Sequence, residues 1–288
     1  MKIISWNIEG LARNIYNLDH FLSSLKPNLV FLSEPQVFLC DVAKLMTPFD
    51  GAYKFVLNSE DSFDLDLSLD RVKAKGGTMA MWDTNLDQYV TVLKTTSPAV
   101  LPLLLKIPGL PVTCHIGVYM PTAGQDEQFV EALSILDTIL CDVQDTLDED
   151  LTIFIRGDMN VSEKNVSRNP LLSHIKSKFN LKAVPLLHPS YHHFIGDGEF
   201  DSSLDVLLHS KQPGVLESLI QHVCKHDHPL VLSQHDLLFS QIFLPKARVP
   251  IASEAPNAPK ACNYSAKIKW SETGKLDYQT AIGSGPGK

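Results

Sequence analysis

The residues best suited to chemistry in this chain lie in the segment 151–161, with the sequence LTIFIRGDMNV. Residues 151–155 are apolar and rich in β-branched side chains, which predicts a short buried strand. Asp158 and Asn160 follow just past the end of that run. Asp158 can hold or deprotonate a water molecule, and Asn160 can hydrogen-bond an oxyanion. The alternative is an ordinary turn, because Asp and Asn side chains hydrogen-bond to their own backbone.

Two strands near the start of the chain also end on polar side chains. Residues 1–8 are predicted to form a strand that carries Asn7 near its end. Residues 29–32 are predicted to form a second apolar strand, which ends just before Glu34. Ligands of open α/β sheets gather at the carboxyl ends of strands, so Asn7 and Glu34 are candidate metal ligands. A solvated loop acid is the alternative for Glu34.

The periodicity elsewhere indicates an α/β chain. From Phe129 to Val143, apolar residues recur at alternating intervals of four and three, which predicts an amphipathic helix. This helix lies between a predicted strand at 112–118, which leads to Tyr119, and the strand at 151–155. Such a strand–helix–strand unit is typical of α/β folds. Tyr119 can present its phenol to a phosphate or simply pack. Further helices are predicted at 14–25, 37–46 and 170–179, and further strands at 78–82, 89–94, 100–106, 203–208 and the apolar run after Asp236.

An acid within one of these strands needs a partner. Asp205 lies inside the apolar run 203–208, and an unpaired buried charge is costly. His235, just before the last predicted strand, is the natural partner. The adjacent pair His192-His193 is predicted to pack in a polar-aromatic loop rather than to bind a metal, because neighbours on a strand face opposite ways.

The composition limits the classes of function. The chain has 288 residues, of which 44% are hydrophobic and 20% charged, as in a soluble globular protein. No apolar run is long enough to span a membrane, and no signal peptide is expected. The five cysteines are scattered, which indicates a reducing compartment and argues against structural zinc. A net charge of −8 means that a DNA-binding groove needs a local basic strip. Arg71, Lys73 and Lys75 are candidates for it, although such a cluster is more often a solvated loop.

Six motifs occur in the order known from the endonuclease/exonuclease/phosphatase superfamily, which the chain resembles from residue 1 to about residue 244. They are SWNIEG, LSEPQ, VYMPTAG, RGDMN, SSLDVLL and SQHDLL. Within that superfamily, the compact length and YMPTAG resemble the apurinic/apyrimidinic-endonuclease-type domain of non-LTR (LINE-type) retrotransposons. We therefore divide the chain into a domain at 1–245 and a mostly disordered, Pro-rich tail at 246–288, similar to the connector that leads to a reverse transcriptase in such elements.

The resemblance implies a fold and an activity. The fold is α/β, a four-layered sandwich of two packed mixed β-sheets flanked by helices. The activity is Mg²⁺-dependent phosphodiester hydrolysis, with Mn²⁺ as a substitute ion, in which a DNA strand is nicked to leave a 3′-hydroxyl. A monomer is expected, acting on DNA in the nucleus, away from membranes, with a downstream reverse transcriptase as partner in the parent element.

The same resemblance implies a role for each motif residue. Glu34 is expected to be the main metal carboxylate, with Asn7 beside it and Glu9 as an outer ligand. Asp158 is expected to align the attacking water, and Asn160 and Tyr119 to hold the scissile phosphate. Asp205 is expected to orient His235, which stabilises the transferring phosphoryl group or protonates the leaving oxygen.

Two positions depart from the family pattern. Gln234 stands where the family usually has an Asp that serves the metal site, so metal affinity is expected to fall. Thr122 stands where Asn is common, which shortens one phosphate contact. Two alternatives to an active DNA endonuclease therefore remain. One is a catalytically weakened remnant that binds nucleic acid or a partner, and the other is a phosphatase of the same superfamily.

Overall fold

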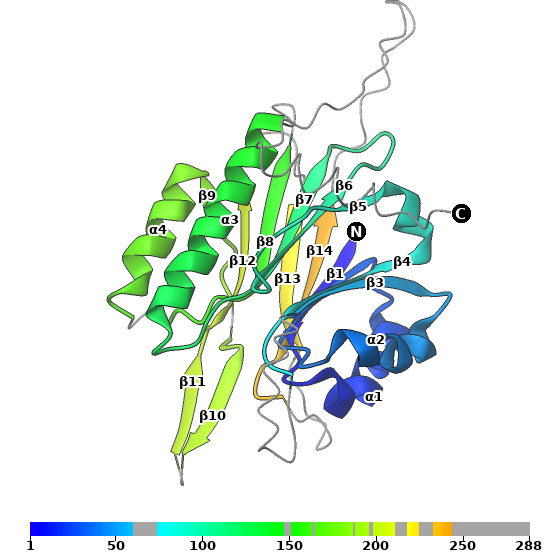
Figure 1. The fold of residues 1–288 in the computed structure, drawn as a ribbon, viewed down its shortest axis with the longest axis horizontal. Coiled ribbons are helices and arrows are strands. Elements are labelled where there is room, and N and C mark those ends of the chain that lie inside the picture. The colour runs from blue at the N-terminus through cyan, green and yellow to red at the C-terminus, as the bar shows by residue number, and fades with distance from the viewer. Residues whose placement is uncertain are drawn as a thin grey trace, which may run out of the picture.

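The chain folds into two β-sheets that pack face to face, with helices on both outer faces (Figure 1). This arrangement comes from a computed structural model in which residues 1–59, 74–146, 151–162, 165–186, 188–195, 198–210, 218–224 and 233–243 are described. It confirms the predicted four-layered α/β sandwich. The predicted tail at 246–288 lies outside the described residues, as do Arg71 and Lys73 of the basic cluster.

The first sheet has the strand order β13-β14-β1-β2-β4-β3. At its centre β1 and β2 are parallel and joined by helix α1, whereas the other neighbours are antiparallel. The elements of this half are β1 (Lys2–Asn7), α1 (Leu11–Leu25), β2 (Leu29–Ser33), α2 (Leu39–Met46), a 3₁₀ turn (Thr47–Phe49), β3 (Tyr53–Asn58), β4 (Thr78–Asp83), β13 (Ser218–Cys224) and β14 (Leu237–Phe243).

The second sheet repeats this plan with the strand order β5-β6-β7-β8-β12-β9. Its central strands β7 and β8 are parallel and joined by helix α3. Its elements are a 3₁₀ turn (Thr84–Tyr89), β5 (Val90–Val92), β6 (Val100–Leu105), β7 (Thr113–Tyr119), α3 (Asp126–Thr146), β8 (Thr152–Asp158), α4 (Arg168–Lys178), β9 (Leu181–Ala183) and β12 (Asp205–Ser210). A separate antiparallel ribbon, β10 (Tyr191–Ile195) with β11 (Gly198–Ser202), extends beyond the end of the sandwich (Figure 1).

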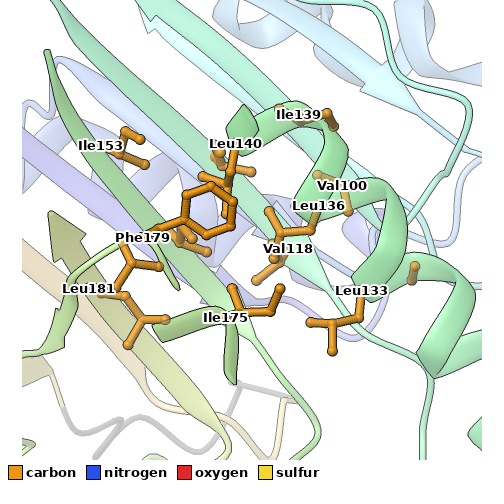
Figure 2. Close-up of a cluster of buried hydrophobic side chains, with 14 of the residues drawn as sticks. Val100, Val118, Leu133, Leu136, Ile139, Leu140, Ile153, Ile175, Phe179 and Leu181 are labelled. Atoms are coloured by element: carbon orange, nitrogen blue, oxygen red, sulfur yellow. The ribbon is translucent and has the colours of Figure 1, made fainter. Parts of the chain in front are cut away.

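Three buried apolar clusters hold the layers together. One lies between the sheets and contains Phe31 and Phe154. The other two lie under the helices. Figure 2 shows the cluster in which Leu136 and Leu140 of α3 pack with Ile153 of β8. Each such side chain contributes roughly 1.5–3 kcal/mol when fully buried, so the helices are fixed mainly by these contacts rather than by their intrinsic propensity.

The predicted elements are largely confirmed, with one clear error. The apolar stripe of α3 is buried as its spacing predicted, and α1 begins three residues earlier than predicted, at Leu11. Residues 190–193 do not form a loop, because Tyr191–Ile195 is strand β10. Both faces of this strand carry polar side chains, so it lacks the apolar–polar alternation from which a strand is predicted. None of the described helices is long and apolar enough to cross a membrane.

Candidate active site

The carboxyl ends of four strands meet at one edge of the sandwich. β1 ends at Asn7 and β2 at Ser33, with Glu34 next in the chain. β7 ends at Tyr119 and β8 at Asp158, and these two residues are register partners. The two parallel strand pairs, one from each sheet, therefore deliver their polar ends to the same place.

Two antiparallel strands begin at this edge and bring the remaining groups. Asp205 is the first residue of β12 and lies opposite Asp158 in the register. His235 lies two residues before β14, which pairs with β1. The indole Nε1 of Trp6 on β1 donates a hydrogen bond to the His235 carbonyl oxygen at 3.0 Å. The segment that carries His235 is thus fixed to the first sheet.

Gly157 allows the two sheets to approach each other at this edge. Its φ of +126° is unfavourable for residues with a side chain, and a Cβ atom there would lie 2.1 Å from the Val118 carbonyl oxygen and 3.1 Å from Ser33 Oγ. The Ser33 hydroxyl donates to the same carbonyl at 2.9 Å, which links β2 of one sheet to β7 of the other. This close approach brings the first sheet within reach of Asp158.

A buried hydrogen-bond network joins the side chains from the two sheets. Asp205 Oδ2 accepts from His235 Nδ1 at 2.8 Å and from the Ser190 hydroxyl at 2.8 Å. The Asn7 amide donates to Asp158 Oδ2 at 3.0 Å and lies 3.4 Å from His235 Nε2. His235 Nε2 is itself 3.8 Å from Asp158 Oδ2. Residues that are up to 228 positions apart in the sequence therefore form one cluster.

Asn160 belongs to a turn and also faces this cluster. It adopts a left-handed conformation with φ of 49°. Its backbone N–H donates to Asp158 Oδ1 at 2.8 Å, and its side-chain amide donates to the Met120 carbonyl at 2.7 Å. The turn interpretation of Gly-Asp-x-Asn is thus correct. It does not exclude a chemical role, since an amide nitrogen has two hydrogens to donate and the described residues accept only one of them.

The two candidate metal carboxylates belong to Glu34, which contacts Tyr119, and to Glu9, whose backbone contacts Asn7. Glu34 has a left-handed backbone with φ of 55°, accepts from the Gln36 amide at 2.9 Å and is hydrogen-bonded by the Tyr119 phenol. The Glu9 backbone N–H donates to Asn7 Oδ1 at 3.2 Å. Asn7 therefore directs its oxygen toward the Glu9 backbone and its nitrogen toward the Asp158 network.

The site concentrates negative charge and holds one histidine as a cation. Burial alone lowers the pKa of His235, but Asp205, Asp158 and Glu9 together raise it to about 9. Burial and then Asp205 raise the pKa of Asp158, against the lowering effect of His235. Burial and the nearby carboxylates also raise the pKa of Tyr119, so its phenol stays protonated and can donate to an anion.

Three further residues, which the sequence analysis did not single out, complete the network. Ser190 shares Asp205 Oδ2 with His235. The Ser233 hydroxyl donates to the Asn7 carbonyl at 2.6 Å and accepts from the His235 backbone N–H at 3.0 Å. The Tyr191 ring lies 4.7 Å from the His235 ring, tilted by 50°. Serine is common in turns, so no sequence pattern distinguishes Ser190 or Ser233. Tyr191 was missed because it was assigned to a loop.

Gln234 is exposed and turned toward the β10 strand. Its side-chain oxygen lies 3.2 Å from His193 Nδ1, and its backbone N–H donates to Glu9 Oε2 at 2.9 Å. The neighbouring Asp236 is buried and bonded to His192 Nε2 at 3.1 Å. Gln234 thus touches a candidate metal ligand, Glu9, through its backbone rather than through its side chain.

The donor set at this edge suits a hard cation that keeps several waters. Among the described residues, no group of three or more His, Cys, Asp or Glu side chains could by itself hold a metal ion. Mg²⁺ does not require such a cage, because it commonly binds one or two carboxylates, waters and substrate phosphate oxygens. Glu9, Glu34 and Asp158 all act electrostatically on Tyr119, and this crowding of carboxylates fits a divalent ion.

Comparison with known proteins identifies the fold. No family model and no curated protein matches the sequence. The structure aligns with the endonuclease domain of TRAS1, a telomere-specific non-LTR retrotransposon, at a TM-score of 0.59 and 14% identity over 85% of this chain and 99% of that chain.

Two enzymes from other sources align equally well. AP endonuclease LMAP from Leishmania major gives a TM-score of 0.63 and 14% identity over 85% of this chain and 88% of that chain. Truncated TDP2 from Caenorhabditis elegans gives a TM-score of 0.59 and 16% identity over 84% of this chain and 96% of that chain. At these identities the likeness establishes the architecture rather than the activity. The chain therefore has the fold of the endonuclease/exonuclease/phosphatase superfamily, as its sequence motifs predicted.

Proposed function

We propose that this protein is a metal-dependent phosphodiesterase that nicks DNA and leaves a 3′-hydroxyl, as a retrotransposon endonuclease does. The observation that carries the proposal is the buried network that links Asp205, His235, Asn7 and Asp158 at the common edge of the two sheets. It brings together a cationic acid, a carboxylate for water and an amide, with the Asn7 amide nitrogen 3.0 Å from Asp158 Oδ2 and 3.4 Å from His235 Nε2.

Each side chain then has a role that its geometry supports. His235, held by Asp205, is protonated at neutral pH and can stabilise the transferring phosphoryl group or give its proton to the leaving oxygen. Asp158 can orient and deprotonate the attacking water. Tyr119, as a neutral phenol, and Asn160, with its remaining amide hydrogen, can hold non-bridging phosphate oxygens.

Glu34, Asn7 and Glu9 are the residues that would hold Mg²⁺, or Mn²⁺ in its place. The ion would supply charge neutralisation at the phosphate oxygens and a lower pKa for a bound water. The Glu34 carboxylate is hydrogen-bonded by the Tyr119 phenol, and the Glu9 carboxylate accepts from the Gln234 backbone N–H at 2.9 Å. Removal of divalent ions with a chelator is therefore expected to abolish nicking, and added Mg²⁺ to restore it.

DNA as substrate is supported by what neighbouring structures contain. TDP2 from D. rerio was solved in complex with a single-strand DNA product, and the 3′ phosphatase NExo from Neisseria with a product DNA hairpin. We further propose that the protein acts as a monomer in the nucleus, with a reverse transcriptase downstream in a parent retrotransposon.

A supercoiled-plasmid nicking assay with Mg²⁺ tests the proposal. Wild-type protein should convert the plasmid to the open circle, and Asp158→Asn and His235→Ala should each lose roughly 10²–10⁴-fold in rate. The matched control is Asp137→Asn, which should keep full activity. Asp137 lies in α3 and is paired with Lys178 at the surface. Equal nicking by wild type and both site variants would reveal a contaminating nuclease and remove the support for this function.

Gln234 supports a second candidate, a weakened remnant that binds nucleic acid. Because Gln234 carries an uncharged amide where the family pattern has an Asp, the site has one carboxylate fewer than that pattern. Salt-sensitive DNA binding without any nicking would favour this candidate. We expect Gln234→Asp to raise activity or lower the Mg²⁺ concentration needed, and a clear drop in activity would contradict that view of the position.

A phosphatase of the same superfamily is the third candidate, because the neighbour NExo is a 3′ phosphatase. A DNA hairpin with a 3′-phosphate end distinguishes the two hydrolytic activities. Release of inorganic phosphate without internal cleavage would favour the phosphatase, whereas nicking of an intact duplex would favour the endonuclease.

A further inference from the structure

Arg168 is a buried cation just outside the candidate active site. It is the first residue of α4, and its side chain is 1% exposed. Its guanidinium lies 4.4 Å from the centre of the Phe129 ring, which belongs to α3. Its backbone N–H donates to Asn165 Oδ1 at 2.9 Å. Both the main chain and the side chain of this residue are therefore fixed.

All the donors of this guanidinium face acceptors. Nε and Nη2 both lie 2.8 Å from Asp126 Oδ1. Nη1 donates to the carbonyl oxygens of Pro121 at 2.6 Å and Asn160 at 3.3 Å, and Nη2 also donates to that of Thr122 at 2.7 Å. A planar fork with five N–H groups can serve four acceptors at fixed angles, whereas a lysine ammonium, with three donors at one point, cannot.

The three carbonyls come from the two turns that follow Tyr119 and Asp158. Pro121 and Thr122 continue the chain from β7, and Asn160 continues it from β8. These turns are already joined by two bonds, from Met120 N–H to the Asp158 carbonyl at 2.9 Å and from the Asn160 amide to the Met120 carbonyl at 2.7 Å. Arg168 adds a second, outer connection between them.

The outer connection reaches a helix as well. Asp126 lies in the first turn of α3, and its carboxylate is 64% exposed, so the arginine rather than burial holds it in place. The guanidinium thus connects the starts of α3 and α4 with the ends of β7 and β8. No residue of the Asp158–His235 network contacts it through a side chain, which separates it from the groups assigned to the chemistry.

We propose that Arg168 is a positioning residue of the active site, which fixes the spacing between the turn after Tyr119 and the turn after Asp158. Its role rests on the proposed function, in which Tyr119 and Asn160 hold the scissile phosphate. Since Asn160 bonds Asp158 through its backbone and Met120 through its side chain, a shift of either turn changes the position of all three. A misplacement of about 1 Å can reduce a rate roughly 10²-fold.

The informative variant is Arg168→Lys, which keeps the positive charge and removes the fork. We expect it to fold and to nick plasmid DNA with a kcat lowered about 10–100-fold, while KM changes by less than about threefold. Lys178→Met is the matched control at the other end of α4, where Lys178 forms an exposed ion pair with Asp137, and should behave as wild type. Full kcat in Arg168→Lys would overturn the proposal.

Guanidinium rescue separates positioning from folding. Arg168→Ala leaves a space of the right shape, so millimolar guanidinium should restore part of its kcat, whereas ammonium at the same concentration should not. The same rescue by ammonium, or loss of kcat in step with loss of thermal stability, would indicate a merely structural role and overturn the proposal.

Amide hydrogen exchange gives a readout that needs neither DNA nor metal. In Arg168→Lys the N–H groups of Met120 and Asn160 should exchange faster than in wild type, while those within β7 and β8 keep their rates. If wild-type protein proves unable to cleave DNA, the proposed function fails, but this exchange pattern still decides whether Arg168 holds the turns. Unchanged exchange at both amides would overturn the proposal whatever the activity.

Discussion

His235 and His115 are both buried between the sheets, with exposed fractions of 4% and 0%, yet their surroundings push them toward opposite protonation states. Carboxylates around His235 raise its pKa to about 9 against the effect of burial. Burial, followed by the nearby Arg156, lowers the pKa of His115 well below the ordinary value. The surroundings thus favour the protonated form of His235 and the neutral form of His115.

The surroundings of His115 are those of a packed core rather than of a site. Its ring stacks on Phe154 at 5.0 Å, and its Nε2 lies 3.0 Å from Thr113 Oγ1. Arg156 Nη2 lies 3.4 Å from His115 Nδ1, and Nη1 donates to Ser240 Oγ at 3.1 Å, while Nε has no hydrogen-bond partner among the described residues. A shifted pKa is therefore not sufficient to mark an active site. What distinguishes His235 is the convergence of strand ends with acids and an amide around it.

Replacement of each histidine is the strongest test of this difference. His235→Ala should reduce the nicking rate by about 10²–10⁴-fold because it removes the acid. His115→Gln should leave the rate within about twofold, since no group assigned to the chemistry contacts His115. The measurement is initial rate of plasmid nicking at saturating Mg²⁺. Comparable losses in both variants would mean that the two regions are functionally coupled.

The pH dependence of stability provides a second test, made on metal-free protein. The folded-state pKa of His235 lies above the unfolded value of 6.5, so its charged interactions contribute fully below pH 6.5 and are lost as pH rises through about 9. The contribution is on the order of 3 kcal/mol. Urea unfolding of wild type and His235→Ala should therefore show a stability difference that shrinks between these pH values. A difference that stays constant with pH would contradict the assigned charge.

Asp205→Asn should lower the pKa of His235 toward that of a histidine without an acidic partner. The variant removes the charge that raises the pKa of His235 and leaves an oxygen to accept from Nδ1. The alkaline limb of the pH–rate profile should shift to lower pH by about 1–2 units. An NMR titration of the imidazole should show the same shift, and an unchanged profile would remove Asp205 from the proposed role.

The smallest effect is expected at Arg156. Arg156→Met removes two hydrogen bonds but also a buried cation for which the described part of the chain offers no carboxylate partner, and burial lowers the pKa of this guanidinium to about 9. Stability should stay the same or rise by about 1 kcal/mol, because replacing buried charge with packed apolar groups is often neutral or favourable. Chemical unfolding of wild type and Arg156→Met measures this change in stability. A clear destabilisation would show that Arg156 is matched to its site as well as Arg168 is.

Local patterns in the sequence predicted the α/β class and the strand-end residues, whereas the four-layered sandwich was predicted from the resemblance to a known superfamily. The stripe from Phe129 to Val143 and the apolar runs before Asn7 and Asp158 specify helix and strands by their spacing alone. The strand at 191–195 could not be found in the same way, since its side chains are matched to Gln234 and Asp236 far along the chain.

The supporting residues were missed for a related reason. Ser190, Ser233 and Arg168 act through contacts with distant backbone or with a single side-chain oxygen, so their neighbours in sequence do not mark them. Arg168 in particular lies two residues before Pro170 at a helix start, where an exposed cation would be the ordinary expectation. Only the register of β7 and β8 explains why it is buried.

The β10–β11 ribbon sets a limit for protein engineering. Its start is tied to the candidate active site, since the carbonyl of the preceding Ser190 accepts from the Asp236 backbone at 2.7 Å and Tyr191 forms an isolated β-bridge with His235. A ribbon grafted from another protein should therefore be joined beyond His193. A junction placed earlier would exchange part of the candidate active site together with the ribbon.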